Sequence, residues 1–165
     1  MAERKVEKVE TEPLNLDKNV LVKNIADWDV GFARKASIGD VTIVPRGQMQ
    51  LSIGEIIVQS QSGNKLFNGT DGMGSHATLI IDDLPTRVEL GFESADGKRK
   101  QLVFSDDLVK EVFDIKNQNK FEEAFKESFV TRSEHIAVIE AITRLGINDF
   151  AKIRFAEEFT GFKVK

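Results

Sequence analysis

The sequence predicts an α+β protein in which a β-rich N-terminal unit is followed by three or four short helices. Before about residue 104 the apolar residues form short runs or alternate with polar ones, whereas after residue 105 they recur at helical spacing. Nine of the 12 phenylalanines follow residue 103, so the two ends of the chain use different core side chains. We expect a polar arm at 1–18, a β-rich unit at 19–104 and a helical unit at 105–165. The sequence leaves open whether both units pack as one domain.

Residues 1–18 are expected to form a polar arm. Lysine and glutamate alternate along it, and it contains a proline, Pro13. Such a segment buries too little apolar area to offset the entropy lost on ordering, so we expect it to be disordered or to lie against a partner. Its charged start lacks the apolar stretch of a secretory signal.

Two strands and one inserted helix are expected in the first half of the β-rich unit. The apolar pattern places strands at 19–24 and 40–45, the second stopped by a proline. A short helix follows at 53–60. Ser52 lies three residues before Glu55, the spacing of a capping box in which hydroxyl and carboxylate satisfy each other's backbone N–H groups.

A three-stranded meander is expected at the end of the β-rich unit. Residues 77–81 form an apolar run, and residues 87–92 alternate between polar and apolar with period two. The Ser-Ala-Asp-Gly sequence at 94–97 is typical of a hairpin turn. The chain would then return through a third strand at 100–104.

Helical spacing and capping residues define the C-terminal unit. Ser105 precedes two aspartates that favour the first turn of a helix. Thr131 and Glu134 have capping-box spacing, and Asn148 is placed to cap the last helix. A stripe of aromatic residues at every fourth position marks another helix: Phe121, Phe125 and Phe129. At this spacing the stripe is typical of a core face, and the alternative is a docking face.

Composition excludes several classes of function. The chain has no cysteine, which excludes disulfides, thiolate zinc sites and cysteine nucleophiles. The formal net charge of −4 argues against generic binding to a phosphate backbone. No apolar run approaches the roughly 18 residues that a membrane span needs. We therefore expect a soluble protein without a membrane partner.

The glycine-rich stretch at 68–77 is the most unusual local motif. It contains Asp71 and His76, which are candidate metal ligands or an acid–base pair. The acidic residues that would complete such a site are not at diagnostic spacing: Glu55, Asp82 and Asp83. Its glycines match a dinucleotide fingerprint only in part, because a strand and not a helix is expected to follow. The alternative is a turn in which Asp71 binds local backbone N–H groups.

The remaining motifs give little support for a catalytic or a DNA-binding function. His76 and His135 are the only histidines, and no G-x-S-x-G spacing is present, so we expect no enzyme activity and no cofactor. Residues 134–158 predict helix, glycine turn and helix, which is compatible with a helix-turn-helix reader. The second helix, however, carries almost balanced charge and would be a poor groove reader.

Three late phenylalanines are candidate partner-binding residues. A helical unit of about 60 residues buries its apolar faces incompletely. Core packing and a partner contact are therefore both open for the last three: Phe155, Phe159 and Phe162.

Residues 19–92 carry a series of short motifs. They are Asn19-Val20-x-Val22-x-Asn24 with Trp28, Gly39-Asp40-Val41-x-Ile43, Leu51-Ser52-x-x-Glu55-Ile56, Gly63-Asn64-x-x-Phe67 and Gly69-Thr70-Asp71-Gly72-x-Gly74-Ser75-His76-Ala77. With these motifs the segment, less than half of the chain, resembles predicted virion proteins of tailed bacteriophages. The resemblance implies a β-rich body, assembly in multiple copies and terminal arms that reach neighbours. It supplies no functional residues.

Together these observations predict a structural or interaction protein. Its expected role is a small component of a phage head, connector or tail that binds copies of itself or neighbouring virion proteins, located in the virion and in the host cytoplasm. No small-molecule substrate is evident. Two alternatives stay open: a nucleic-acid-associated regulatory domain that uses the C-terminal helical hairpin, and a metal-dependent enzyme at Asp71 and His76.

Overall fold

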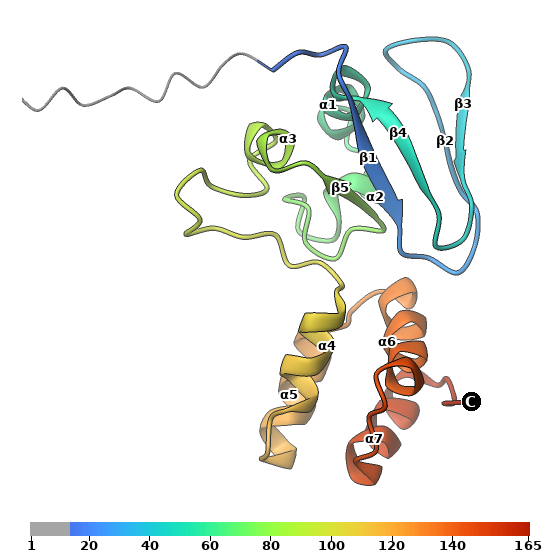
Figure 1. Ribbon diagram of the computed structural model, residues 1–165, viewed down its shortest axis with the longest axis vertical. Coiled ribbons are helices and arrows are strands. Elements are labelled where there is room, and N and C mark those ends of the chain that lie inside the picture. The colour runs from blue at the N-terminus through green and yellow to red at the C-terminus, as the bar shows by residue number, and fades with distance from the viewer. Residues whose placement is uncertain (1–13) are drawn as a thin grey trace, which may run out of the picture.

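A computed structural model describes residues 14–165 and confirms the α+β class (Figure 1). The strands are β1 (Asn19–Asn24), β2 (Val30–Ala33), β3 (Asp40–Ile43), β4 (Gln48–Ser52) and β5 (Leu79–Asp82). The helices are α1 (Ile53–Gln61), α2 (Lys65–Asn68), α3 (Leu84–Glu89), α4 (Asp106–Phe113), α5 (Gln118–Ser128), α6 (Arg132–Arg144) and α7 (Phe150–Thr160). All five strands precede the four C-terminal helices.

The strands form a three-stranded sheet and a separate hairpin. The sheet has the order β4-β1-β5, and β1 pairs antiparallel with both neighbours. β2 and β3 form the hairpin, in which Val30 lies opposite Ile43. Along β1 the side chains of Val20, Val22 and Asn24 are buried, while Lys23, which lies between Val22 and Asn24, is exposed. The strand at 19–24 is therefore confirmed, and the one expected at 40–45 ends at Ile43.

The expected meander at 77–104 is wrong beyond its first strand. The apolar run forms β5, but residues 84–89 form helix α3 instead of a second strand. Asp83 caps that helix by accepting a hydrogen bond from the Thr86 N–H, and Pro85 occupies its first turn. Helix initiation therefore outweighs the short period-two pattern. Residues 100–104 form an irregular linker, although the turn at 94–97 is present.

The expected capping box of α1 is only half formed. The Ser52 hydroxyl accepts a hydrogen bond from the Glu55 N–H at 3.2 Å, as predicted. The Glu55 carboxylate does not return the bond to Ser52. It is buried and accepts hydrogen bonds from the backbone N–H groups of Lys35 and Ala36 at 3.0 to 3.1 Å. Because Lys35 and Ala36 lie in the turn of the β2–β3 hairpin, helix α1 holds that turn in place.

Two of the three caps predicted for the C-terminal helices are confirmed, and α5, for which none was predicted, is capped by Asn117. Ser105 caps α4, and Thr131 and Glu134 form a complete capping box at α6. The last helix is capped by Asp149 and not by Asn148, so it begins one residue later than expected. The aspartate side chain accepts a hydrogen bond from the Lys152 N–H, which is the bond that an N-cap supplies.

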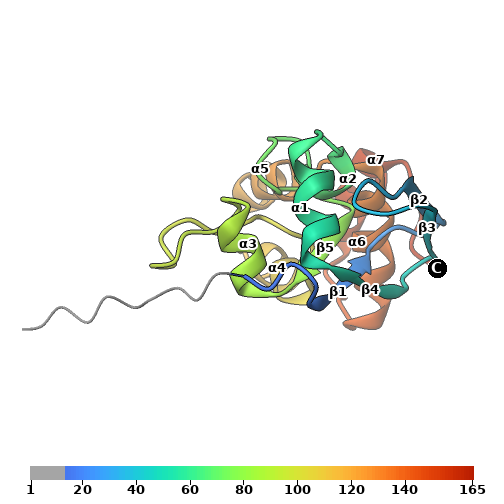
Figure 2. The same ribbon diagram turned by 90° about the horizontal axis from the view of Figure 1, so that it is seen from above.

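The buried apolar side chains form two clusters that share no residue. One cluster lies between the sheet, the hairpin and α1, and the other lies among α4 to α7. Figure 1 shows the helical bundle beyond one end of the sheet, joined to it by the linker at 100–104, and in the view of Figure 2 the bundle lies behind the sheet. Residues 1–13 of the expected arm lie outside the described residues. Residues 14–18 are attached to the fold, because the Leu16 carbonyl accepts a hydrogen bond from the Gly54 N–H.

Candidate interaction surface

The phenylalanine stripe of α5 is core. All three of its side chains, on Phe121, Phe125 and Phe129, are fully buried. Their rings pack against one another at centroid distances of 5.0 to 5.8 Å. The stripe therefore organises the helical cluster and offers no docking face.

The three candidate partner-binding phenylalanines are only partly buried. Phe155 and Phe159, one turn apart on α7, stack with ring centroids 5.8 Å apart and an interplanar angle of 11°. Phe159 retains 40% of its accessible area, while Phe155 and Phe162 are half-buried. The His135 ring lies 5.5 Å from Phe159 and continues the surface towards the first turn of α6. We call Phe155, Phe159, His135 and Phe162 the aromatic strip.

Cationic side chains border the aromatic strip. The Lys126 amino group lies 5.9 Å from the ring centroids of both Phe155 and Phe159. The Arg132 guanidinium lies 5.5 Å from the centroid of Phe162. An apolar, aromatic centre with a polar rim is the arrangement found in protein–protein interfaces. These cations could not be predicted from the sequence, because each ring belongs to a different segment from its cation.

The glycine-rich loop is a compact support for the linker between the two units. Asp71 accepts hydrogen bonds from the backbone N–H groups of Met73 and Ser75, as the turn interpretation predicts. The Gly74 carbonyl accepts a hydrogen bond from the buried Gln101 side chain at 2.6 Å, and the His76 N–H donates to the Leu102 carbonyl. A Cβ at Gly74 would meet the Phe92 ring at 2.7 Å, so close packing explains that glycine.

Asp71 and His76 have separate roles in the structure. Burial opposes the charge on Asp71, but the hydrogen bonds from Met73 and Ser75 outweigh it and lower the pKa of the carboxyl below its usual 3.8. The lowered pKa belongs to a loop-stabilising carboxylate. Among residues 14–165, no group of three or more His, Asp or Glu side chains could hold a metal ion.

His76 bridges to a buried carboxylate on α6. Its Nδ1 lies 2.9 and 3.0 Å from the two carboxylate oxygens of Glu134, whose side chain is 0% exposed. Glu134 also accepts hydrogen bonds from the N–H groups of Val130 and Thr131. The backbone of His76 is in the left-handed region, at φ 60°, which a non-glycine residue rarely adopts. The α6 capping box is therefore also a joint between the two units.

A second joint lies farther along α6. Arg46, in the turn between β3 and β4, forms an ion pair with Glu140. Both joints use acidic side chains of α6 and cationic or imidazole groups of the β-rich unit.

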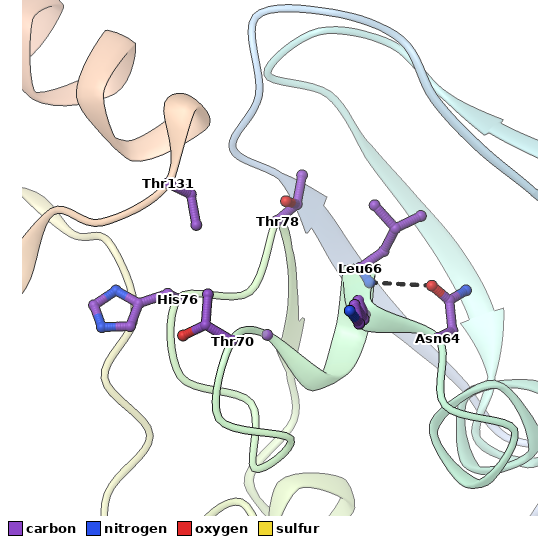
Figure 3. A pocket seen from close by; sticks show the side chains of 8 residues that line it. Asn64, Leu66, Thr70, His76, Thr78 and Thr131 are labelled. Carbon is purple, nitrogen blue, oxygen red and sulfur yellow. Dashed lines mark hydrogen bonds between the residues drawn. The ribbon is translucent and has the colours of Figure 1, made fainter. Parts of the chain in front are cut away.

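A hollow of about 460 Å³ opens beside the His76 joint (Figure 3). Figure 3 shows the His76 imidazole directed away from Leu66 and Asn64 on the other side of the hollow. Hydroxyl groups, one amide and one exposed lysine provide most of its polar lining. The lining residues are Asn64, Lys65, Leu66, Gly69, Thr70, His76, Thr78 and Thr131. The orientation of the imidazole provides no acid–base group aimed into this hollow.

Helix α7 is poorly suited to reading DNA. The Lys152 amino group is buried and donates a hydrogen bond to the Phe113 carbonyl at 2.6 Å. Arg154 pairs with Glu158 one turn later, at 3.2 Å. The two cations of the helix are thus already engaged, which leaves little positive charge for phosphate groups.

No protein-family model, curated protein or solved structure matched the chain. Within the part of the chain that the structure describes, no helix is long and apolar enough to span a membrane. The resemblance to phage virion proteins stays a prediction.

Proposed function

We propose that this chain is a non-catalytic interaction protein that associates with copies of itself and with neighbouring proteins of a larger particle. The observation that carries the proposal is the aromatic strip with its cationic border. The virion of a tailed phage, and the host cytoplasm before assembly, are the setting that the sequence resemblance favours.

The strip has the two properties that an association surface needs. Two of its side chains, on Phe155 and Phe159, rest on the buried stripe of α5, since the Phe125 ring lies 5.7 and 5.9 Å from theirs between centroids. They are therefore held in place before binding, which reduces the entropy lost on association. They also stay partly open to solvent, so covering them with a partner removes apolar area from water.

Replacing Phe159 with glutamine tests the strip. We expect self-association to weaken about tenfold or more, because a central aromatic anchor contributes more than its neighbours to an interface. The matched control is Phe150→Gln, because Phe150 is 78% exposed but lies outside the strip. Light scattering on the eluting protein gives the mass of each variant at several concentrations, and thermal unfolding checks that both fold.

Equal association by both variants and the natural chain would contradict a role for the strip. The virion setting has its own test: detection of the chain in purified particles of its source would support it. Absence of the chain from those particles would exclude it.

A further inference from the structure

A short turn at residues 94–100 carries a concentrated positive charge. Figures 1 and 2 show it as the yellow-green loop that projects from the body after α3. Three consecutive cations follow one another at its end: Lys98, Arg99 and Lys100. All three are exposed, Lys98 to 87% of its side-chain area. We call residues 94–100 the basic turn.

Hydrogen bonds fix the shape of the basic turn. The Ser94 N–H donates to the Arg99 carbonyl at 3.0 Å, and the Arg99 N–H donates back to the Ser94 hydroxyl at 2.8 Å. Asp96 accepts from the Ser94 hydroxyl at 2.6 Å and from the Lys98 N–H at 3.0 Å. The only acid of the turn is thus engaged in shaping it and also lies 3.9 Å from the Lys98 amino group, while Arg99 and Lys100 pair with no acid within the turn.

The charge of the turn is opposite to that of the rest of the chain. Three cations and one aspartate give residues 94–100 a formal charge of +2, while the whole chain carries −4. The remaining residues therefore carry −6. A chain with one cationic projection and an acidic body is electrostatically complementary to a second copy of itself.

Helix α4 offers an acidic face that fits the turn. Asp107, Glu111 and Asp114 follow one another at helical spacing, on the face opposite the buried Val109 and Val112. The exposed Lys110 lies among them, three residues after Asp107 and four before Asp114. All three carboxylates are exposed. Three carboxylates and Lys110 give this face a formal charge of −2, opposite to the +2 of the basic turn. In both ribbon views the turn lies apart from α4 of its own chain, so contact between them requires a second copy (Figures 1 and 2).

We propose that the basic turn of one copy docks on the acidic face of α4 in the next copy. This contact is heterologous, because each copy uses two different surfaces, and repetition generates a ring or an open filament. The proposal rests on the proposed function, since it names one contact of the same self-association.

Charge reversal and its rescue test this contact in the full chain. The turn variant is Lys98→Glu with Arg99→Glu and Lys100→Glu, and the helix variant is Glu111→Lys with Asp114→Lys. Asp107 is left in place because an acid stabilises the first turn of the helix. The control reverses three exposed cations elsewhere: Lys18, Lys120 and Lys163. Sedimentation at about 0.01 M salt, where the Debye length is about 30 Å, measures association.

We expect each variant alone to weaken association about tenfold, the combined variant to restore it, and the control to change it little. Self-association of the natural chain should also weaken as the salt concentration rises to about 1 M, where the Debye length falls to about 3 Å. If neither charge reversal weakens association, or if the combined variant fails to restore it, the contact is overturned and the proposed function is left intact.

Two other outcomes are separable from these. A natural chain that stays monomeric at low salt would contradict both the contact and self-association. Tight binding of fluorescent duplex DNA by the natural chain, lost in the turn variant and unaffected by the helix variant, would assign the basic turn to nucleic acid instead and overturn the contact between copies.

Discussion

Glu134 is the residue on which the relation between the two units depends most directly. Its carboxylate is fully buried and accepts hydrogen bonds from Val130, Thr131 and the imidazole of His76. A buried carboxylate is costly unless every oxygen is bonded, and here the bonds come from both units. The side chain thus caps α6 and fixes the glycine-rich loop against it.

Replacing Glu134 with alanine should lower the free energy of unfolding by about 2–4 kcal/mol, because it removes the cap and leaves buried donors unpaired. Urea unfolding measures the change. Glu140→Ala is the matched control on the same helix, since its ion pair with Arg46 is partly exposed and should cost no more than about 1 kcal/mol. Similar losses in the free energy of unfolding of the two variants would show that the buried joint stabilises the fold no more than the exposed ion pair does.

The sequence predicted Glu134 as a capping residue, and the structure confirms it. It could not predict the bond to His76, because those residues are 58 positions apart and meet only when the units pack. Asp71 is the opposite case: its partners Met73 and Ser75 are neighbours in sequence, so the turn interpretation was accessible from the motif.

At the scale of elements, local capping signals were the most reliable guide. Ser52, Ser105 and Thr131 all cap the helices that they were expected to begin. The alternation at 87–92 wrongly predicted a strand, because it spans few residues and follows the helix-start signals Asp83 and Pro85. Strand β4 was not predicted from the sequence. It has alternating apolar residues, Met49 and Leu51, but it is short and its other positions are polar.

Glu55 shows how an element can be placed correctly while its contacts are not. The spacing from Ser52 predicted a reciprocal cap, but the carboxylate instead accepts hydrogen bonds from the hairpin turn. An N–H group of another segment competes for the same oxygen, and only the fold decides between them. The consequence is that α1 and the β2–β3 hairpin are mechanically linked.

Glu55→Gln should loosen this link, since the substitution replaces one of the two oxygens that accept hydrogen bonds from Lys35 and Ala36 with an NH₂ group, which can only donate. We expect faster hydrogen exchange at the Lys35 and Ala36 amides, with a loss of about 1–3 kcal/mol in stability. The Arg34 amide, which donates to the Gly39 carbonyl within the hairpin, is the internal control. Unchanged exchange at Lys35 and Ala36 would contradict the role assigned to Glu55.

At the scale of the whole molecule, two apolar clusters are joined by a linker and two polar joints. The clusters share no residue, while the joints combine His76 with Glu134 and Arg46 with Glu140. Phenylalanine content predicted a change of core chemistry near residue 104. It could not predict which aromatic rings stay open, because exposure of Phe159 depends on the packing of α5, α6 and α7.

The proposed association draws on two surface features of the molecule. The aromatic strip supplies apolar area, and the basic turn and the acidic face of α4 supply charges of opposite sign on separate parts of the chain. Apolar contact generally contributes affinity, whereas charge complementarity contributes specificity and association rate. The two features therefore support the same proposed function through different physical terms.

The absolute mass of the natural chain, measured by light scattering over a wide range of concentrations at low salt, tests self-association most directly. A single chain has a mass of 18.5 kDa. We expect a mass that rises with concentration to a discrete multiple of this value, or to that of a growing filament. A mass of one chain at every concentration would contradict it.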